Sequence, residues 1–162
     1  MPRPESRLAS MPADRQYFFT SRHGVLRSRW RRRTFVRAFA DGHINLLIIV
    51  GEAGLSKGTT VRNTLGDDAC WIEGNATAFG IYLKLYAHRD VPVVLDDLDE
   101  LHASKNAIRL LKCLCQTEPE KRVAWPTAAR ELKQEGVPRE FTTRSRVVII
   151  SNEWHTRNID VH

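Results

Sequence analysis

The chain has 162 residues, of which 42% are hydrophobic and 27% are charged, and its formal net charge is +6. These values are typical of one soluble globular domain, and they exclude both a disordered polar chain and two domains of ordinary size. No apolar run approaches the roughly 20 residues of a membrane-spanning helix, so we expect no membrane partner.

The first 40 residues carry most of the positive charge. They contain ten arginines against Glu5 and Asp14, a local net charge of +8, which leaves −2 for the rest of the chain. Residues 1–22 have no sustained hydrophobic period and predict an irregular arm. From residue 25 to residue 40 the arginines alternate with apolar side chains, which predicts a basic amphipathic helix that ends at Asp41-Gly42. We therefore expect a basic arm over residues 1–40, partly disordered or helical, and one domain over residues 41–162.

Such an arm suits two interpretations. One is a solvated extension, and the other is a contact surface for nucleic acid, in which guanidinium groups bind phosphates and an indole stacks on bases. The candidate nucleic-acid residues are Arg27, Arg29, Trp30, Arg31, Arg32 and Arg33. The stretch from Arg32 to Val36 is also similar to a twin-arginine export signal, but no small-residue cleavage site follows it, which argues against export.

Beyond the arm, apolar strands alternate with helical patterns. Strands are predicted over residues 44–50, 69–73, 91–95 and 146–150, and helices over residues 57–65, 77–88 and 104–115. This alternation predicts βαβ units and a mainly parallel sheet, hence an α/β fold.

A glycine-containing loop joins the first of these strands to a helix. Glycines let backbone N–H groups close around an anion, a helix N-terminus adds favourable potential, and a lysine can then reach the β- and γ-phosphates. We therefore predict an ATP phosphate site formed by Gly51, Glu52, Ala53, Gly54, Leu55, Ser56, Lys57, Gly58 and Thr59. The usual pattern is G-x-x-x-x-G-K-[ST], from which Ser56 and Gly58 depart.

Two further strand ends carry polar side chains. Asp96 and Asp97 follow an apolar strand at the end where open α/β sheets bind ligands. One carboxylate there can hold Mg²⁺ through water, and the next can orient or deprotonate the attacking water. Asn152 ends the last strand, where its amide can reach the γ-phosphate or that water. Thr59, one residue beyond the usual hydroxyl position, is the other candidate metal ligand.

The order of phosphate loop, acidic strand and Ser-Asn strand end resembles the core of AAA+ ATPases. The segments WIEGNATAFGIYLKLY, VVLDDLDEL and VVIISNEW resemble a compact AAA+ group of tailed phages and bacteria. The resemblance covers roughly residues 44–154. It implies Lys57 as phosphate contact, Asp96 as magnesium carboxylate, Asp97 in place of the catalytic glutamate, and Asn152 as sensor 1, with ATP and Mg²⁺ as cofactors.

The resemblance also implies a three-layer P-loop NTPase fold, truncated after the sensor-1 strand, since no arginine finger or lid follows Asn152. The family's strand order is 5-1-4-3-2, so the loss of strand 5 leaves residues 44–50 at an edge unless the N-terminal segment covers them. The expected function is ATP binding with weak or partner-dependent hydrolysis, acting on nucleic acid. The alternatives are a non-catalytic nucleic-acid-binding module and an inactive AAA+ fragment. Homo-oligomer formation is left open, since neither an arginine finger nor a lid is present to indicate it.

The three cysteines add a prediction about location. Cys70, Cys113 and Cys115 form no CxxC pair, which argues against a disulfide framework and a zinc site. Cys113 and Cys115 lie two residues apart in a helical pattern, so their side chains face different directions. Reduced cysteines predict a cytoplasmic protein.

Overall fold

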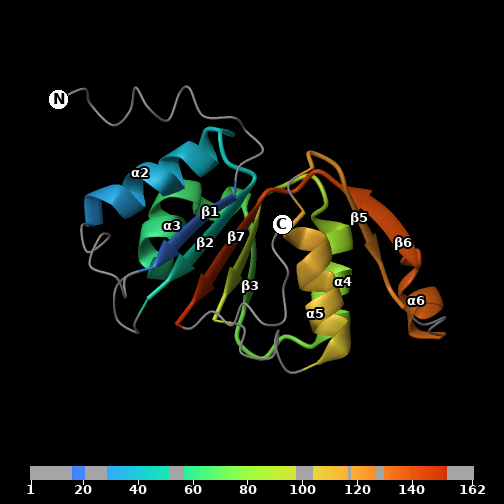
Figure 1. Cartoon of the computed structure of the whole chain (residues 1–162). Coiled ribbons are helices and arrows are strands. Elements are labelled where there is room, and N and C mark those ends of the chain that lie inside the picture. Colours follow the sequence, from blue (N-terminus) through green and yellow to red (C-terminus); the bar gives the residue numbers. More distant parts are fainter. Residues whose placement is uncertain are drawn as a thin grey trace.

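A computed structural model describes residues 16–20, 29–51, 57–97, 104–116, 118–126 and 130–152. Strands and helices alternate through most of this part of the chain (Figure 1). The elements are β1 (Gln16–Thr20), α2 (Arg29–Ala40), β2 (Leu46–Val50), α3 (Lys57–Leu65), η1 (Gly66–Asp68), β3 (Cys70–Glu73), α4 (Ala78–Ala87), β4 (Val93–Asp96), α5 (Lys105–Leu114), β5 (Lys121–Ala124), α6 (Arg130–Glu135), β6 (Glu140–Thr143) and β7 (Val147–Ser151).

Five strands form one parallel sheet in the order β1-β2-β7-β4-β3. The register places Val50 beside Ser151 and Asp96 beside Ile150, so the strands finish nearly level with one another. Strands β5 and β6 form a separate antiparallel pair. The order of β2, β7, β4 and β3 is the order that the resemblance predicts for strands 1, 4, 3 and 2.

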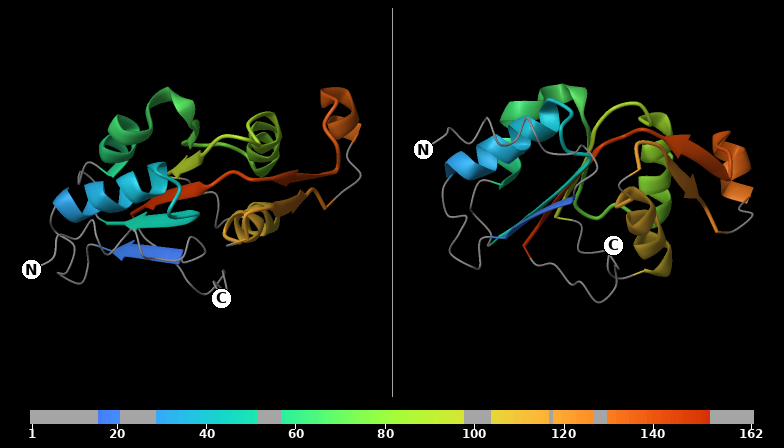
Figure 2. Two further views of the ribbon diagram at one scale, coloured as in Figure 1. Left: turned by 90° about the horizontal axis from the view of Figure 1, so that it is seen from above. Right: turned by 45° about the horizontal axis from the view of Figure 1, so that its top comes forward.

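The sheet is buried on both faces because its side chains alternate between two apolar cores. Leu46, Ile48 and Val50 of β2 pack in the core formed with α4 and α5. Leu47 and Ile49 pack in the other core, with Val36 and Phe39 of α2 and Val61 of α3. Figures 1 and 2 show α2 and α3 on one side of the sheet and α4 and α5 on the other. The fold is therefore α/β and compatible with three layers. Among the described helices, none is long and apolar enough to cross a membrane.

Strand β1 corrects the expectation that residues 1–22 form only an irregular arm. Gln16–Thr20 pairs in parallel with all five residues of β2. A five-residue run has too little length to show a period by itself, and its conformation depends on β2, about 30 residues later in the chain. The N-terminal segment thereby covers the edge that β2 would otherwise expose.

The segment between α5 and β7 contains β5, α6 and β6, none of which is predicted from the sequence. Val123, Trp125 and Phe141 pack in the core that also holds Tyr82 of α4. The side chain of Lys121 is buried and donates a hydrogen bond to the Ser145 carbonyl at 3.0 Å. Burial lowers the pKa of this ammonium to about 8.

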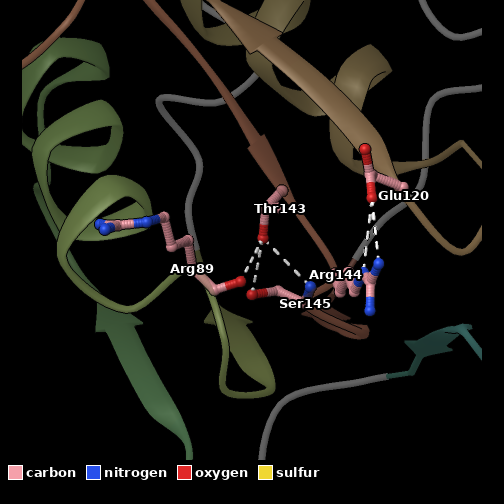
Figure 3. A network of polar contacts seen from close by, with 5 residues as sticks. All are labelled: Arg89, Glu120, Thr143, Arg144 and Ser145. Atoms are coloured by element: carbon pink, nitrogen blue, oxygen red, sulfur yellow. Dashed lines mark hydrogen bonds and ion pairs between the residues drawn. The ribbon is translucent and has the colours of Figure 1, made fainter.

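Hydrogen bonds join the end of β6 to the turn after α4 (Figure 3). The Thr143 hydroxyl donates to the Arg89 carbonyl at 2.7 Å and accepts from the Ser145 amide at 3.0 Å. Arg144 forms an exposed ion pair with Glu120 at 3.4 Å. The buried hydroxyls of Thr143 and Ser145 are both hydrogen-bonded, which offsets the cost of removing them from water.

Candidate functional site

The five parallel strands end at one edge of the sheet, called here the carboxyl edge. Asp96 and Glu73 are the last residues of β4 and β3, while Gly51 and Asn152 follow β2 and β7. Asp96 and Glu73 are register partners. Ligands of open α/β sheets bind outside this edge, because the loops there leave room and present polar groups.

Lys57 is the first residue of α3, and its side chain lies across the carboxyl edge. It is 7% exposed. Its ammonium donates to the Asn152 Oδ1 at 3.0 Å and to the Gly51 carbonyl. The start of α3 is thus joined to the ends of both β2 and β7. The intervening loop residues of the predicted phosphate site, Glu52, Ala53, Gly54, Leu55 and Ser56, lie outside the described residues.

Asn152 connects Lys57 to Asp97. Its Nδ2 donates to Asp97 Oδ1 at 3.3 Å, while the Asp97 amide donates to the Ile150 carbonyl at 3.0 Å. Asp97 has a φ of 52°, in the left-handed region. Asp tolerates this conformation better than most residues, but it still costs on the order of 1 kcal/mol or more. A lysine, an amide and a carboxylate from three separate segments are therefore held in one chain of hydrogen bonds.

Asp96 lies against the first turn of α3. A Cβ atom on Gly58 would stand 2.9 Å from Asp96 Oδ2, closer than real Cβ atoms come to such a neighbour. Gly58 is the residue at which the usual pattern carries the magnesium-binding hydroxyl. Thr59 is exposed, as expected from a side chain rotated by about 100° along the helix. Asp96 therefore lies beside Gly58, whose lack of a side chain leaves room for the carboxylate.

At the carboxyl edge, burial and neighbouring like charges disfavour the ionised forms of Asp96 and Lys57. Burial raises the pKa of Asp96, and Glu73 and Asp97 raise it further, whereas Lys57 and Arg62 act in the opposite direction. Burial lowers the pKa of Lys57, and Arg32 lowers it further, whereas Asp97 and Asp96 raise it. A cation near the two aspartates and an anion near Lys57 would each relieve part of this cost.

These side chains suit magnesium bound together with a phosphate. Within the described residues, no group of three or more His, Cys, Asp or Glu side chains could hold a metal ion alone. Magnesium characteristically takes one or two carboxylates, several waters and the oxygens of a phosphate. Asp96 and Asp97 supply that number of carboxylates.

Two residues at the edge were missed by the sequence analysis. Glu73 ends β3 beside Asp96, and Arg62 of α3 forms an ion pair with Glu73. The Arg62 guanidinium also lies 4.0 Å from the centre of the Trp71 ring. Glu73 could have been found by the argument that identified Asp96, because both carboxylates end a buried strand.

The candidate nucleic-acid residues do not share one environment. Arg33 is exposed on α2, but Arg32 beside it is 5% exposed. Arg29, Trp30 and Arg31 belong to the first turn of α2, and nothing is described of their side chains. Arg27 lies outside the described residues. The arginine run is therefore not one continuous solvated surface.

Comparison with known proteins identified a phage relative. Over 129 residues the chain is 31% identical to the uncharacterized 36.7 kDa protein of the nrdC-mobD intergenic region of enterobacteria phage T4. The matched region is 74% of this chain but 39% of the phage protein, so the chain spans well under half the length of that relative. No family model matches the chain, and no solved structure matches it.

Proposed function

We propose that the chain is an ATP-binding domain of the AAA+ type of P-loop NTPase, with weak or partner-dependent hydrolysis. The observation that carries the proposal is the position of Lys57. A buried ammonium at the start of a helix lies across the ends of two parallel strands, within hydrogen-bond distance of Asn152. The carboxylates of Asp96 and Asp97, at the end of β4, are close enough to Lys57 to raise its pKa. The parallel sheet and its strand order support the same interpretation.

Each residue has a distinct role in this proposal. Lys57 exchanges its bonds to Gly51 and Asn152 for phosphate oxygens, which are stronger partners for an ammonium than neutral carbonyls. Asp96 would hold a magnesium ion through water, and the ion would neutralise charge on the phosphates. The second N–H of the Asn152 Nδ2 can donate to the γ-phosphate, and the Oδ1, released from Lys57, can accept from a water and position it. Asp97 would accept a proton from that water.

The first test is the affinity for Mg-ATP. The Lys57→Ala variant is expected to bind Mg-ATP about 2–3 kcal/mol more weakly than the unmodified chain, because a charge-assisted phosphate contact is lost. Isothermal titration calorimetry of both proteins under the same conditions measures this difference. Lys105→Ala, which removes an exposed lysine from α5, is a matched control that should keep the full affinity.

Turnover is expected to be slow even where ATP binds. The loop offers Gly58 where a magnesium-binding hydroxyl is usual, and the Thr59 side chain is exposed. Phosphate release from Mg-ATP should therefore stay below about 0.01 s⁻¹, against roughly 1–10³ s⁻¹ for typical enzymes. Adding a hydroxyl by Gly58→Thr requires Asp96 to rotate away, since the new Cβ would meet its carboxylate. Turnover near 1 s⁻¹ in the unmodified chain, lost in the Asp97→Asn variant, would contradict the expectation that this loop supports only slow hydrolysis.

Binding of nucleic acid through the arm remains a second proposal, supported by the exposed Arg33 and Arg37 on α2. Deletion of the arm is unsuitable as a test, because it also removes β1. Substitution of Arg27, Arg29, Arg31 and Arg33 by Gln, with Arg32 retained, separates the charge of the arm from its structural contribution. Loss of DNA binding at low salt would then report phosphate contacts.

A further inference from the structure

Arg32 lies on the buried face of α2. It precedes Val36 by four residues and Phe39 by seven, the spacing that places side chains on one side of a helix. Val36 and Phe39 are fully buried in the core between α2, α3 and the sheet. Arg33 and Arg37 on the other face are exposed. Arg32 therefore continues the packed face of the helix with a charged group.

The direction of α2 brings Arg32 to the carboxyl edge. At the C-terminal end of the helix, Arg146, just before β7, donates to the Phe39 carbonyl, so this end lies where the strands begin. Arg32 is two helical turns away, about 10 Å towards the opposite edge. In Figures 1 and 2 the blue N-terminal end of α2 lies on the side where β1 and β2 finish.

At that edge, two buried cations of the chain influence each other. After burial, Arg32 is the main cause that lowers the pKa of Lys57. A guanidinium does not deprotonate in proteins, so its charge persists. A polyanion bound at this edge would be attracted by both charges, and a partly buried site screens that attraction less than water does.

We propose that Arg32 is a second phosphate-binding residue, which contacts the same polyphosphate as Lys57. This proposal rests on the proposed function of the carboxyl edge. It removes Arg32 from the candidate nucleic-acid residues and gives α2 a part in nucleotide binding. A guanidinium can bind two phosphate oxygens at once, so it adds geometric selection to the point charge of the lysine.

The test is the Arg32→Met variant, which keeps an unbranched apolar stem in the core and removes the charge. Two ligands are titrated by calorimetry in the presence of Mg²⁺, ATP and inorganic tripolyphosphate, which lacks the base and sugar. Both dissociation constants are expected to rise about tenfold or more. The melting temperature of the ligand-free variant is measured alongside, to separate a loss of binding from a loss of folding. Arg33→Met, on the exposed face of the same helix, should change none of these values.

The outcomes separate this proposal from the assignment of the site. If Lys57→Ala loses affinity while Arg32→Met keeps it for both ligands, Arg32 is not a phosphate-binding residue. A loss confined to ATP, with tripolyphosphate unaffected, would place Arg32 at the base or sugar and overturn the proposal. A lower melting temperature of ligand-free Arg32→Met, with unchanged dissociation constants, would make its role structural. If the unmodified chain binds neither ligand, the proposed function itself is wrong.

Discussion

Deleting residues 1–22 is expected to lower the free energy of unfolding by about 3 kcal/mol or more and to cause association between chains. The deletion removes β1, which pairs along the whole of β2. Each backbone hydrogen bond contributes about 0.5–1.5 kcal/mol net, and a five-residue strand forms several of them. It also leaves β2, buried on both faces, as an open edge that other strands can extend.

Urea unfolding followed by circular dichroism measures the loss of stability, and light scattering measures the association. A deletion of residues 1–13 is the control, since it shortens the arm but retains Gln16–Thr20. It should have the stability of the full chain. If both deletions unfold at the same urea concentration as the full chain and scatter light no more than it does, β1 does not complete the sheet.

The Asp96→Asn variant is expected to lose the effect of magnesium on ATP binding. Asp96 is proposed to hold the ion through water, and loss of a hydrogen-bonding partner around a metal typically weakens metal binding by about 10- to 100-fold. The dissociation constant for ATP should therefore change little between Mg²⁺ and EDTA in the variant. Asp90→Asn, an exposed aspartate ahead of the same strand, should behave like the unmodified chain.

The same variant is expected to be more stable than the unmodified chain at neutral pH without ligand. Burial and the neighbouring acids raise the pKa of Asp96, so between its unfolded and folded pKa the folded state binds more protons. This stabilising protonation is complete below the unfolded pKa and is lost as pH rises through the folded pKa. The advantage of Asn should thus shrink on acidification. A variant that is less stable at pH 7 and equally responsive to Mg²⁺ would exclude Asp96 as the magnesium carboxylate.

Elements that a local hydrophobic pattern specifies could be predicted from the sequence, whereas elements that depend on pairing with distant residues could not. Helices α4 and α5 repeat apolar residues at helical spacing, and β2, β4 and β7 are short apolar runs, so local pattern was sufficient for them. The order of β2, β7, β4 and β3 agreed with the order that the resemblance implied. Strand β1 was missed because its pairing partner lies about 30 residues away. The β5–β6 hairpin was missed because its alternation extends over only four residues in each strand.

The candidate site was predictable in part for the same reason. Asp96, Asp97 and Asn152 could be placed together because parallel strands end at one edge, and hydrogen bonds join Lys57 to Asn152 and Asn152 to Asp97. Arg32 could not be assigned from the sequence, since a run of arginines predicts a solvated face. Its spacing to Val36 and Phe39 does place it on the apolar face of α2, but its position near Lys57 depends on how α2 packs against α3, which no local pattern specifies. Gly58 looked like a missing ligand, and the structure adds that its lack of a side chain accommodates Asp96.

The central claim is that a nucleotide phosphate binds Lys57 at the carboxyl edge, and one calorimetric comparison tests it most directly. Mg-ATP is titrated into the unmodified chain, into Lys57→Ala and into the Lys105→Ala control. We expect saturable binding to the unmodified chain and the control, and a dissociation constant at least about 30-fold higher for Lys57→Ala. Equal affinity of Lys57→Ala and the unmodified chain, or no binding of ATP by any of the three proteins, would contradict the assignment.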